Sequence, residues 1–141
     1  MNSESRRAMT QDVERLIIEF FYHLDESRFE ELAELIADDG VWTRQGEALR
    51  GPAMVLAALR KRLAGTVTRH VVTNLLVDLP DENQAEASFY MTVFRHDADR
   101  RAEGPIAMEL PYAVARCRGR LALAPGGWRI KELAAVPTFR R

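Results

Sequence analysis

The sequence predicts an α+β fold, with helices in the first half of the chain and strands in the second. Apolar residues up to residue 65 recur at helical spacing or follow helix-start signals. From Thr68 onward, long β-type runs alternate with turn residues. Because helices do not alternate with strands, the strands are expected to form an antiparallel meander covered by the helices. The 141 residues suffice for one domain with its own core.

The first predicted helix has one buried face. Its apolar residues recur at intervals of three and four; they are Val13, Leu16, Ile17, Phe20, Phe21 and Leu24. Thr10 or Asp12 can cap the start of this helix. Residues 1–9 lack such a stripe, so we expect a flexible arm there, followed by a single domain over residues 10–141.

Two further helices are predicted from their end signals. Ser27 and Glu30 have the spacing of a capping box, in which each side chain satisfies a free backbone N–H of the first turn. This second helix is expected to end at 38–40. The third begins at Gly51-Pro52, because proline is tolerated in the first helical turn, and ends at Gly65 in a left-handed cap.

The strands form a short pair and a long meander. The short pair is Val41–Arg44 and the extended piece to Arg50, joined by a turn near Gly46. The four long strands are expected at 68–78, 84–96, 106–123 and 128–136. The charged segment 97–105 between the second and third long strands is predicted to be a loop.

The strand at 68–79 is uncharged in its middle on both faces. Its even positions are His70, Val72, Asn74 and Leu76, and its odd positions are Val71, Thr73, Leu75 and Val77. A half-solvated antiparallel strand normally alternates apolar with polar residues. We infer that one face lines a pocket with polar groups and that a second subunit covers the other. This predicts a homodimer through the outer face of the sheet; coverage by a loop or by the C-terminal tail is the alternative.

Charge and cysteine content argue against several classes of function. The 20 basic and 21 acidic residues give a net charge of -1, which does not favour nucleic acid as a partner. One cysteine, Cys117, provides neither an internal disulfide nor a Cys-rich zinc site. No signal peptide is recognisable, and no apolar segment approaches the roughly 20 residues that span a bilayer. The sequence therefore predicts a cytoplasmic protein without a membrane partner.

Asp25 and His70 are the candidate catalytic residues. An acid at the end of the first helix opposes the helix dipole, and Ser27 already serves as the next cap, so Asp25 has no local structural role. It either points into water or serves function. His70 lies on the presumed pocket face with Asn74, and a carboxylate beside an imidazole orients it as a general base. A hydrogen-bonded core histidine is the alternative.

Other side chains are candidates for binding a ligand. Aromatic and sulfur-containing residues suited to lining a pocket are Tyr22, Trp42, Phe89, Tyr90, Phe94, Met108 and Tyr112, although ordinary core packing explains most such residues. His96 ends a strand beside a charged loop, and His23 falls outside the apolar stripe. The three histidines lack the spacing of a metal site, so no metal is predicted.

Several segments resemble the SnoaL-like members of the nuclear-transport-factor-2-like superfamily. They are 22–29, 35–39, 41–42, 51–52, 68–74 and 127–130, and the resemblance covers about residues 10–137. It implies a cone-shaped, cystatin-like α+β fold with three helices covering a curved antiparallel sheet, an internal pocket and, commonly, a dimer.

The resemblance also bears on the candidate site. Lyases of the scytalone-dehydratase and dehydrochlorinase type use an acid and a histidine where Asp25 and His70 stand, and His96 matches a second histidine of the dehydratases by spacing. Leu24 and Arg44 occupy the places of the dehydratases' pocket tyrosines. No asparagine follows Asn83 to match their late asparagine. These departures make scytalone an unlikely substrate.

Two functions follow from this pattern. The first is a cofactor-independent acid–base enzyme, a dehydratase, isomerase or cyclase, acting on a small hydrophobic, ring-bearing molecule. In it His70 removes a proton, Asp25 orients the imidazole, and Asn74 or Tyr22 holds a substrate oxygen. The second is a non-catalytic ligand-binding or accessory subunit, as in the β subunits of ring-hydroxylating dioxygenases, which resemble this fold.

Overall fold

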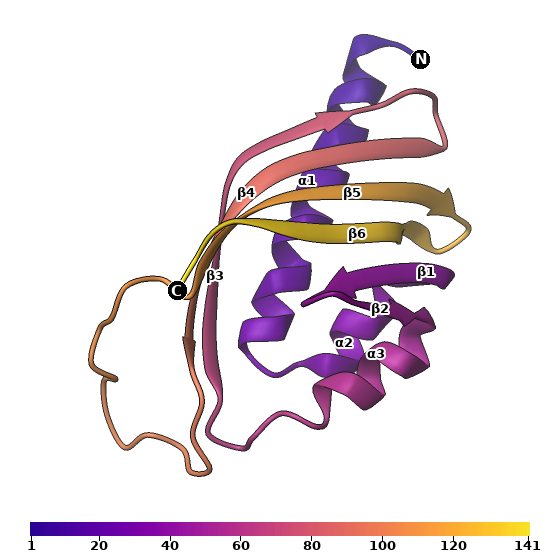
Figure 1. The fold of residues 1–141 in the computed structure, drawn as a ribbon. Helices are drawn as coiled ribbons and strands as arrows, with labels where there is room; N and C mark the ends of the chain where they lie inside the picture. The colour runs from indigo at the N-terminus through magenta and orange to yellow at the C-terminus, as the bar shows by residue number, and fades with distance from the viewer.

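Three helices and six strands follow one another in the computed structural model, which describes residues 1–141. The helices are α1 (Ser3–Asp25), α2 (Phe29–Glu34) and α3 (Gly51–Leu59). The strands are β1 (Ile36–Arg44), β2 (Glu47–Arg50), β3 (Val67–Asp78), β4 (Gln84–His96), β5 (Ala113–Ala124) and β6 (Gly127–Arg140). Figure 1 shows the sheet curving around α1, with α2 and α3 near β1 and β2. The predicted α+β class is confirmed.

All six strands form one sheet in the order β2-β1-β6-β5-β4-β3. The meander from β3 to β6 is antiparallel, as predicted, but β1 pairs with β6 in parallel. The expectation of a wholly antiparallel sheet is therefore wrong at this one pair. The reason is topological: the β1–β2 hairpin precedes the meander and joins its far edge, so β1 and β6 run in the same direction.

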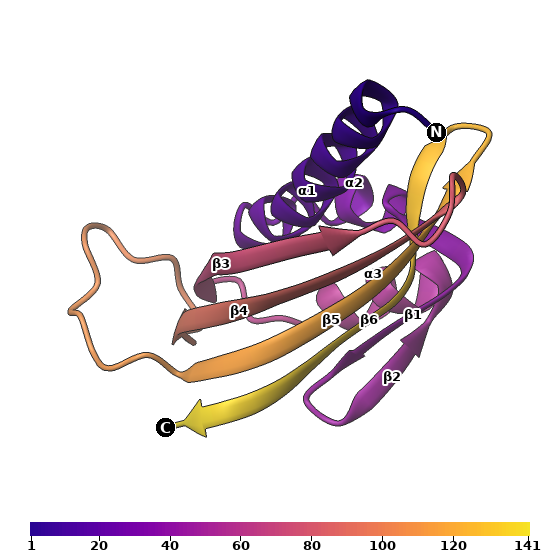
Figure 2. The same cartoon turned by 90° about the horizontal axis from the view of Figure 1, so that it is seen from above.

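The core lies between α1 and the concave face of the sheet, as the two views show (Figures 1 and 2). The predicted stripe of α1 is buried along its whole length, from Val13 to Leu24. It packs against inward-facing residues of the meander, among them Phe89, Leu121 and Ile130. Burial of this stripe fixes α1 along the sheet and brings its last residue, Asp25, next to β3.

The predicted flexible arm is wrong, because residues 3–9 form the first turns of α1. The side chain of Asn2 accepts a hydrogen bond from the backbone N–H of Ser5 at 2.8 Å, which caps the helix eight residues before Thr10, the earlier of the two expected caps. Arg6 also donates to the carbonyl of Leu79 at 3.4 Å, and Met9 packs against the core. These first turns are largely exposed, so they carry no apolar stripe that would indicate where the helix begins.

The predicted ends of α2 and α3 also need correction. Ser27 does not form a capping box: its φ is 57°, and α2 begins at Phe29 without a side-chain cap. Glu34 ends α2, so the expected stop at 38–40 lies inside β1. Pro52 stands in the first turn of α3 as predicted, but this helix ends at Leu59, and Gly65 does not cap it. In each case the residue predicted to begin or end a helix belongs to a turn or to a strand.

Two strands differ from prediction in ways that affect the site. The register of β3 on β4 shifts between Thr73 and Leu76, and Asn74 within this bulge has a φ of 55°. β5 begins at Ala113, and residues 106–112 belong to the loop that projects from the sheet in Figure 2. The apolar residues of that segment had suggested a strand. None of the three helices has the length and apolar content of a membrane-spanning segment.

Candidate functional site

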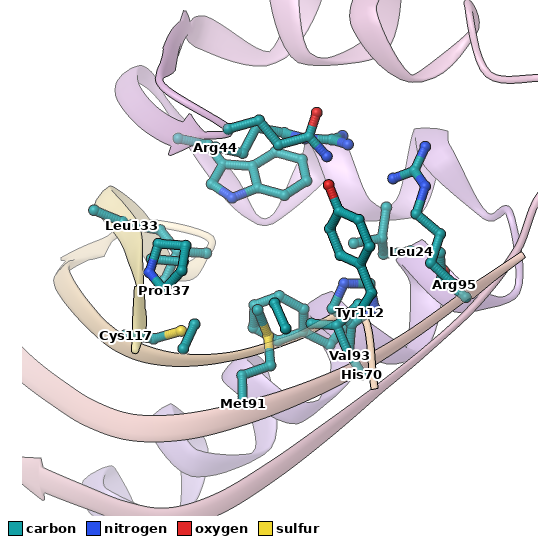
Figure 3. A pocket seen from close by; sticks show the side chains of 18 of the residues that line it. Leu24, Arg44, His70, Met91, Val93, Arg95, Tyr112, Cys117, Leu133 and Pro137 are labelled. Carbon is teal, nitrogen blue, oxygen red and sulfur yellow. The ribbon is translucent and has the colours of Figure 1, made fainter. Parts of the chain in front are cut away.

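A cavity of about 280 Å³ opens between the end of α1, the concave face of the meander and the β1–β2 hairpin. Figure 3 shows side chains from each of these elements pointing into it. Its apolar lining includes Leu24, Met91, Val93, Leu133 and Pro137. Its lining residues come from α1, β1, β3, β4, β5, β6 and the segment after α3, so one cavity gathers residues from most of the chain.

Asp25 and His70 form a hydrogen-bonded pair at the wall of this cavity. His70 Nδ1 lies 2.6 Å from Asp25 Oδ1, and the backbone N–H of His70 donates to Asp25 Oδ2 at 2.8 Å. The Thr68 hydroxyl donates to Asp25 Oδ1 at 2.8 Å. Each side chain of the pair is 10% exposed. Three donors from β3 thus surround a carboxylate that the C-terminal end of a helix would otherwise disfavour.

This pairing assigns different tasks to the two ring nitrogens of His70. With Nδ1 bonded to the carboxylate, the neutral ring carries its proton on Nδ1 and leaves a lone pair on Nε2. The imidazole also stacks on Phe21, with ring centroids 5.3 Å apart. Since His70 lines the cavity, Nε2 can accept a proton from a bound molecule while Asp25 holds the ring in place.

Four arginines also reach the cavity: Arg44 from β1, Arg62 from the segment after α3, Arg95 from β4 and Arg140 from the end of β6. Burial, followed by the positive charges of Arg62 and Arg95, lowers the pKa of Arg44. Burial and the charge of Arg95 likewise lower the pKa of Arg62. These shifts indicate that the guanidinium groups of Arg44, Arg62 and Arg95 lie close enough for their charges to interact.

Two of these arginines have protein partners. Arg62 donates to the hydroxyl of Thr68 at 3.2 Å and to the carbonyl of Leu24 at 3.5 Å. Arg95 Nε donates to Asp97 at 2.9 Å. Arg44 instead lies over the Trp42 indole, with 4.9 Å between its Cζ atom and the ring centroid. Sequence reasoning missed this cluster, although Arg44 follows Trp42 by two strand positions and therefore shares its inward face.

Cys117 contributes an apolar surface to the cavity. Burial raises the pKa of its thiol to about 12. The thiol is therefore protonated at neutral pH, which suits a wall that excludes charge and not a nucleophile. No three His, Cys, Asp or Glu side chains converge anywhere in the chain in the manner of a metal site.

Four of the residues predicted from the sequence meet at the cavity. His70, Trp42 and Tyr112 line it, and Asp25 joins them through its hydrogen bond to His70. Trp42 is buried, and the Tyr112 hydroxyl points toward the end of the cavity that Arg44 and Arg95 occupy (Figure 3).

The other predicted binding residues lie elsewhere. Tyr22 is 51% exposed under the guanidinium of Arg28, and Tyr90 is 52% exposed on the outer face of the sheet. Asn74 lies in the bulge of β3, which breaks the alternation that placed it beside His70. His96 and Met108 line a separate hollow under the 97–112 loop, because residues 106–112 are not part of β5. Helical position explains Tyr22, strand alternation explains Tyr90, the bulge explains Asn74, and the loop at 106–112 explains the other two.

The model of the SnoaL-like domain family matches residues 5–134. The chain belongs to this family. Three solved structures illustrate the fold that this SnoaL-like protein shares. A hexachlorocyclohexane dehydrochlorinase, LinA-type3 from Novosphingobium barchaimii LL02, aligns with a TM-score of 0.81 at 16% identity, covering 99% of this chain and 93% of that one.

A protein assigned as a scytalone dehydratase from Novosphingobium aromaticivorans DSM 12444 gives a TM-score of 0.73 at 17% identity, with 99% and 91% of the two chains covered. A protein from Catenulispora acidiphila gives 0.73 at 24% identity, with 94% of each chain covered. At these identities the likeness shows the fold alone. The search of curated proteins found no match. The nuclear-transport-factor-2-like fold that the sequence resembles is thus confirmed for this SnoaL-like chain.

Proposed function

We propose that this SnoaL-like protein is a cofactor-independent acid–base enzyme acting on a small hydrophobic, ring-bearing molecule. The observation that carries the proposal is the His70–Asp25 pair, joined at 2.6 Å and placed on the wall of a cavity of about 280 Å³. Dehydration or another elimination, isomerisation and cyclisation are the reaction types that one base in a water-poor pocket supports.

In the proposed mechanism, Nε2 of His70 takes a proton from a carbon next to an electron-withdrawing group. The imidazolium formed is stabilised by the carboxylate of Asp25, which keeps its own position through Thr68. The proton then returns to a leaving group or to another carbon of the substrate. Trp42 and Tyr112 line the cavity and supply aromatic surface against which a ring can pack.

The open cavity favours this proposal over a non-catalytic accessory subunit. An accessory role predicts a cavity filled by Trp42, Phe89 and Met108, or a separated Asp25–His70 pair. Phe89 is instead packed in the core and Met108 is 88% exposed, so neither fills the space. The similar structures include proteins described as a dehydrochlorinase and a scytalone dehydratase, which supports elimination as the first reaction to test.

Exchange of substrate protons with solvent tests the proposal without knowledge of the product. Wild type, His70→Ala and Asp25→Asn are incubated in D₂O with a panel of bicyclic ketones and hydroxylated polycyclic and terpenoid compounds, and C–H loss is followed by NMR. A positioned general base contributes roughly 10²–10⁴-fold, so His70→Ala is expected to lose that factor and Asp25→Asn part of it.

His96→Ala is the matched control, because this histidine lies outside the cavity. It should retain the wild-type exchange rate. Equal rates for wild type, His70→Ala and Asp25→Asn would remove the pair from the chemistry. Exchange by none of the panel, with the cavity shown to bind its members, would favour the accessory role.

A further inference from the structure

The cavity carries a concentration of positive charge at one end. Arg44, Arg62 and Arg95 all line it; the charges of Arg62 and Arg95 lower the pKa of Arg44, and the charge of Arg95 lowers that of Arg62. In Figure 3 the guanidinium groups of Arg44 and Arg95 point toward the same end as the Tyr112 hydroxyl, and His70 lies nearer the floor. The walls between are apolar, including Val93. The cavity therefore has one polar end, and the rest of its wall is largely apolar.

The acidic side chains nearby offset part of the charge of Arg62 and Arg95, because Asp25 and Asp97 both raise the pKa of Arg62 and Asp97 pairs with Arg95. Asp25 is held by His70 and Thr68, and Asp97 is bound to Arg95 and to the Thr66 hydroxyl. Glu47, the exposed cross-strand partner of Arg44, is the one acid whose charge raises the pKa of Arg44. Arg62 donates hydrogen bonds to the Thr68 hydroxyl and to the carbonyl of Leu24.

Among the half-buried arginines of the cavity, Arg44 is the one without a hydrogen-bonding partner. Its contact with Trp42 fixes the plane of the guanidinium but uses none of its five N–H donors. Half-buried guanidinium groups that repel one another are a costly arrangement, and a bound anion removes much of that cost. A planar carboxylate matches the guanidinium fork in geometry as well as in charge.

We propose that the natural substrate carries a carboxylate, which binds at the end of the cavity formed by Arg44, Arg62 and Arg95. Its ring then lies along the apolar lining toward His70. This inference rests on the proposed function, since it names the substrate class of the same pocket. The cavity of about 280 Å³ is close to the lower end of the range of roughly 300–1,000 Å³ typical of ligand pockets, which suits a compact molecule of one or two rings.

The test compares two ligands that differ in charge but hardly in shape. Binding of 2-naphthoate and of the neutral 2-naphthamide to the full chain is measured by isothermal titration calorimetry at 50 and 500 mM salt. A charge-assisted bond predicts that the carboxylate binds about tenfold or more tightly than the amide. Arg44→Met should reduce this preference strongly and leave amide binding nearly unchanged, and high salt should weaken only the carboxylate.

Arg95→Met is the second variant, in case loss of the Arg44–Trp42 contact disturbs folding, and it should weaken carboxylate binding as well. Arg7→Met, which alters an exposed arginine of α1, is the control and should bind like wild type. Equal affinity for the two probes, unchanged binding in both cavity variants, or no binding by wild type at millimolar concentration would overturn the inference.

The outcome is separable from that of the proposed function. His70→Asn should still discriminate between naphthoate and naphthamide, because this histidine is assigned to proton transfer and not to the anion. If proton exchange proves independent of His70 while the charge preference persists, the proposed chemistry fails and the carboxylate site stands. If exchange requires His70 but naphthamide binds as tightly as naphthoate, the carboxylate site is ruled out and the proposed chemistry stands.

Discussion

At the scale of single residues, Asp25 is the position from which the rest of the site follows. A carboxylate at the C-terminal end of α1 opposes the helix dipole, and the structure shows what offsets that cost. Its two oxygens accept from the hydroxyl of Thr68, the backbone N–H of His70 and the imidazole. Thr68 is 2% exposed and also accepts from Arg62, so one hydroxyl connects the carboxylate to the arginine cluster.

Thr68→Val tests the role of that hydroxyl, because valine keeps the shape of threonine but not its hydrogen bonds. The substitution leaves Asp25 and Arg62 each short of a buried partner, so the free energy of unfolding is expected to fall by about 1–3 kcal/mol in urea denaturation. Thr138→Val, at an exposed position of β6 outside the cavity lining, is the control and should change it by less than about 0.5 kcal/mol. Similar values for both variants would contradict the prediction.

The residues of the site were predictable from sequence where a local rule was broken. An acid without a capping role marked Asp25, and an uncharged strand marked His70. Asn74 was misplaced because a one-residue bulge in β3 turns the following side chains to the other face. Tyr90 was misplaced because it follows Phe89 in a regular strand, so only one of the two can face the cavity. The resemblance placed Arg44 at a pocket position, but its residue type did not suggest a ligand-binding role because an arginine near a turn is normally solvated.

At the scale of elements, the junction of β1 with β6 depends on a glycine. The pairing shifts between Ile36 and Val41, and Gly40 lies within this irregularity. A Cβ atom at this position would meet the carbonyl oxygen of Ile130 and stand 2.7 Å from Cγ2 of Ile36. Backbone atoms supply the closest contact, so side-chain movement cannot relieve it.

Gly40→Ala is therefore expected to lower the free energy of unfolding by about 1–3 kcal/mol or more, measured by urea or thermal denaturation. The loss comes from separation of β1 and β6 at the bulge. Gly104→Ala is the matched control, since a Cβ there meets nothing within 4 Å, and it should leave stability nearly unchanged. A stable Gly40→Ala protein with intact β1–β6 amide protection would show that the backbone can yield here.

Element types were more predictable than their limits or pairings. The stripe of α1 and the strand at 84–96 gave strong periodic signals, and both elements are present. Segment 106–112 failed because apolar residues alone suggested a strand, although Pro105 and Pro111 remove backbone donors at its two ends. The parallel β1–β6 pair joins distant segments, and periodicity within a segment carries no information about such a partner.

At the scale of the whole molecule, the outer face of the sheet is the surface that remains uncovered. A row of outward side chains crosses four strands in register: Thr73, Tyr90, Arg116 and Val136. Neither the 97–112 loop nor the C-terminal segment covers it, since Tyr90 is 52% and Val136 59% exposed. We propose that a second copy of the chain packs on this face, which buries its apolar members.

Light scattering coupled to size-exclusion chromatography checks the proposal. Wild type is expected to elute with about twice the chain mass of 16.0 kDa. Val136→Glu places a charge in the apolar part of the row and should shift the protein toward the monomer, whereas Ile18→Glu, at an exposed site on α1, should not. A wild-type monomer at high micromolar concentration would exclude this arrangement.

β6 supplies Leu133 and Pro137 to the cavity and is also the strand against which β1 aligns Trp42 and Arg44. Asp25 and His70 need neither β1 nor β6, because α1 and β3 bring them together. During folding, the proton-accepting group can thus be in place while the opposite walls are still missing and water surrounds the imidazole. The cavity is enclosed only when β1 pairs with β6 and brings Trp42 beside Leu133, so a chain lacking this pairing holds the Asp25–His70 pair without a closed cavity around it.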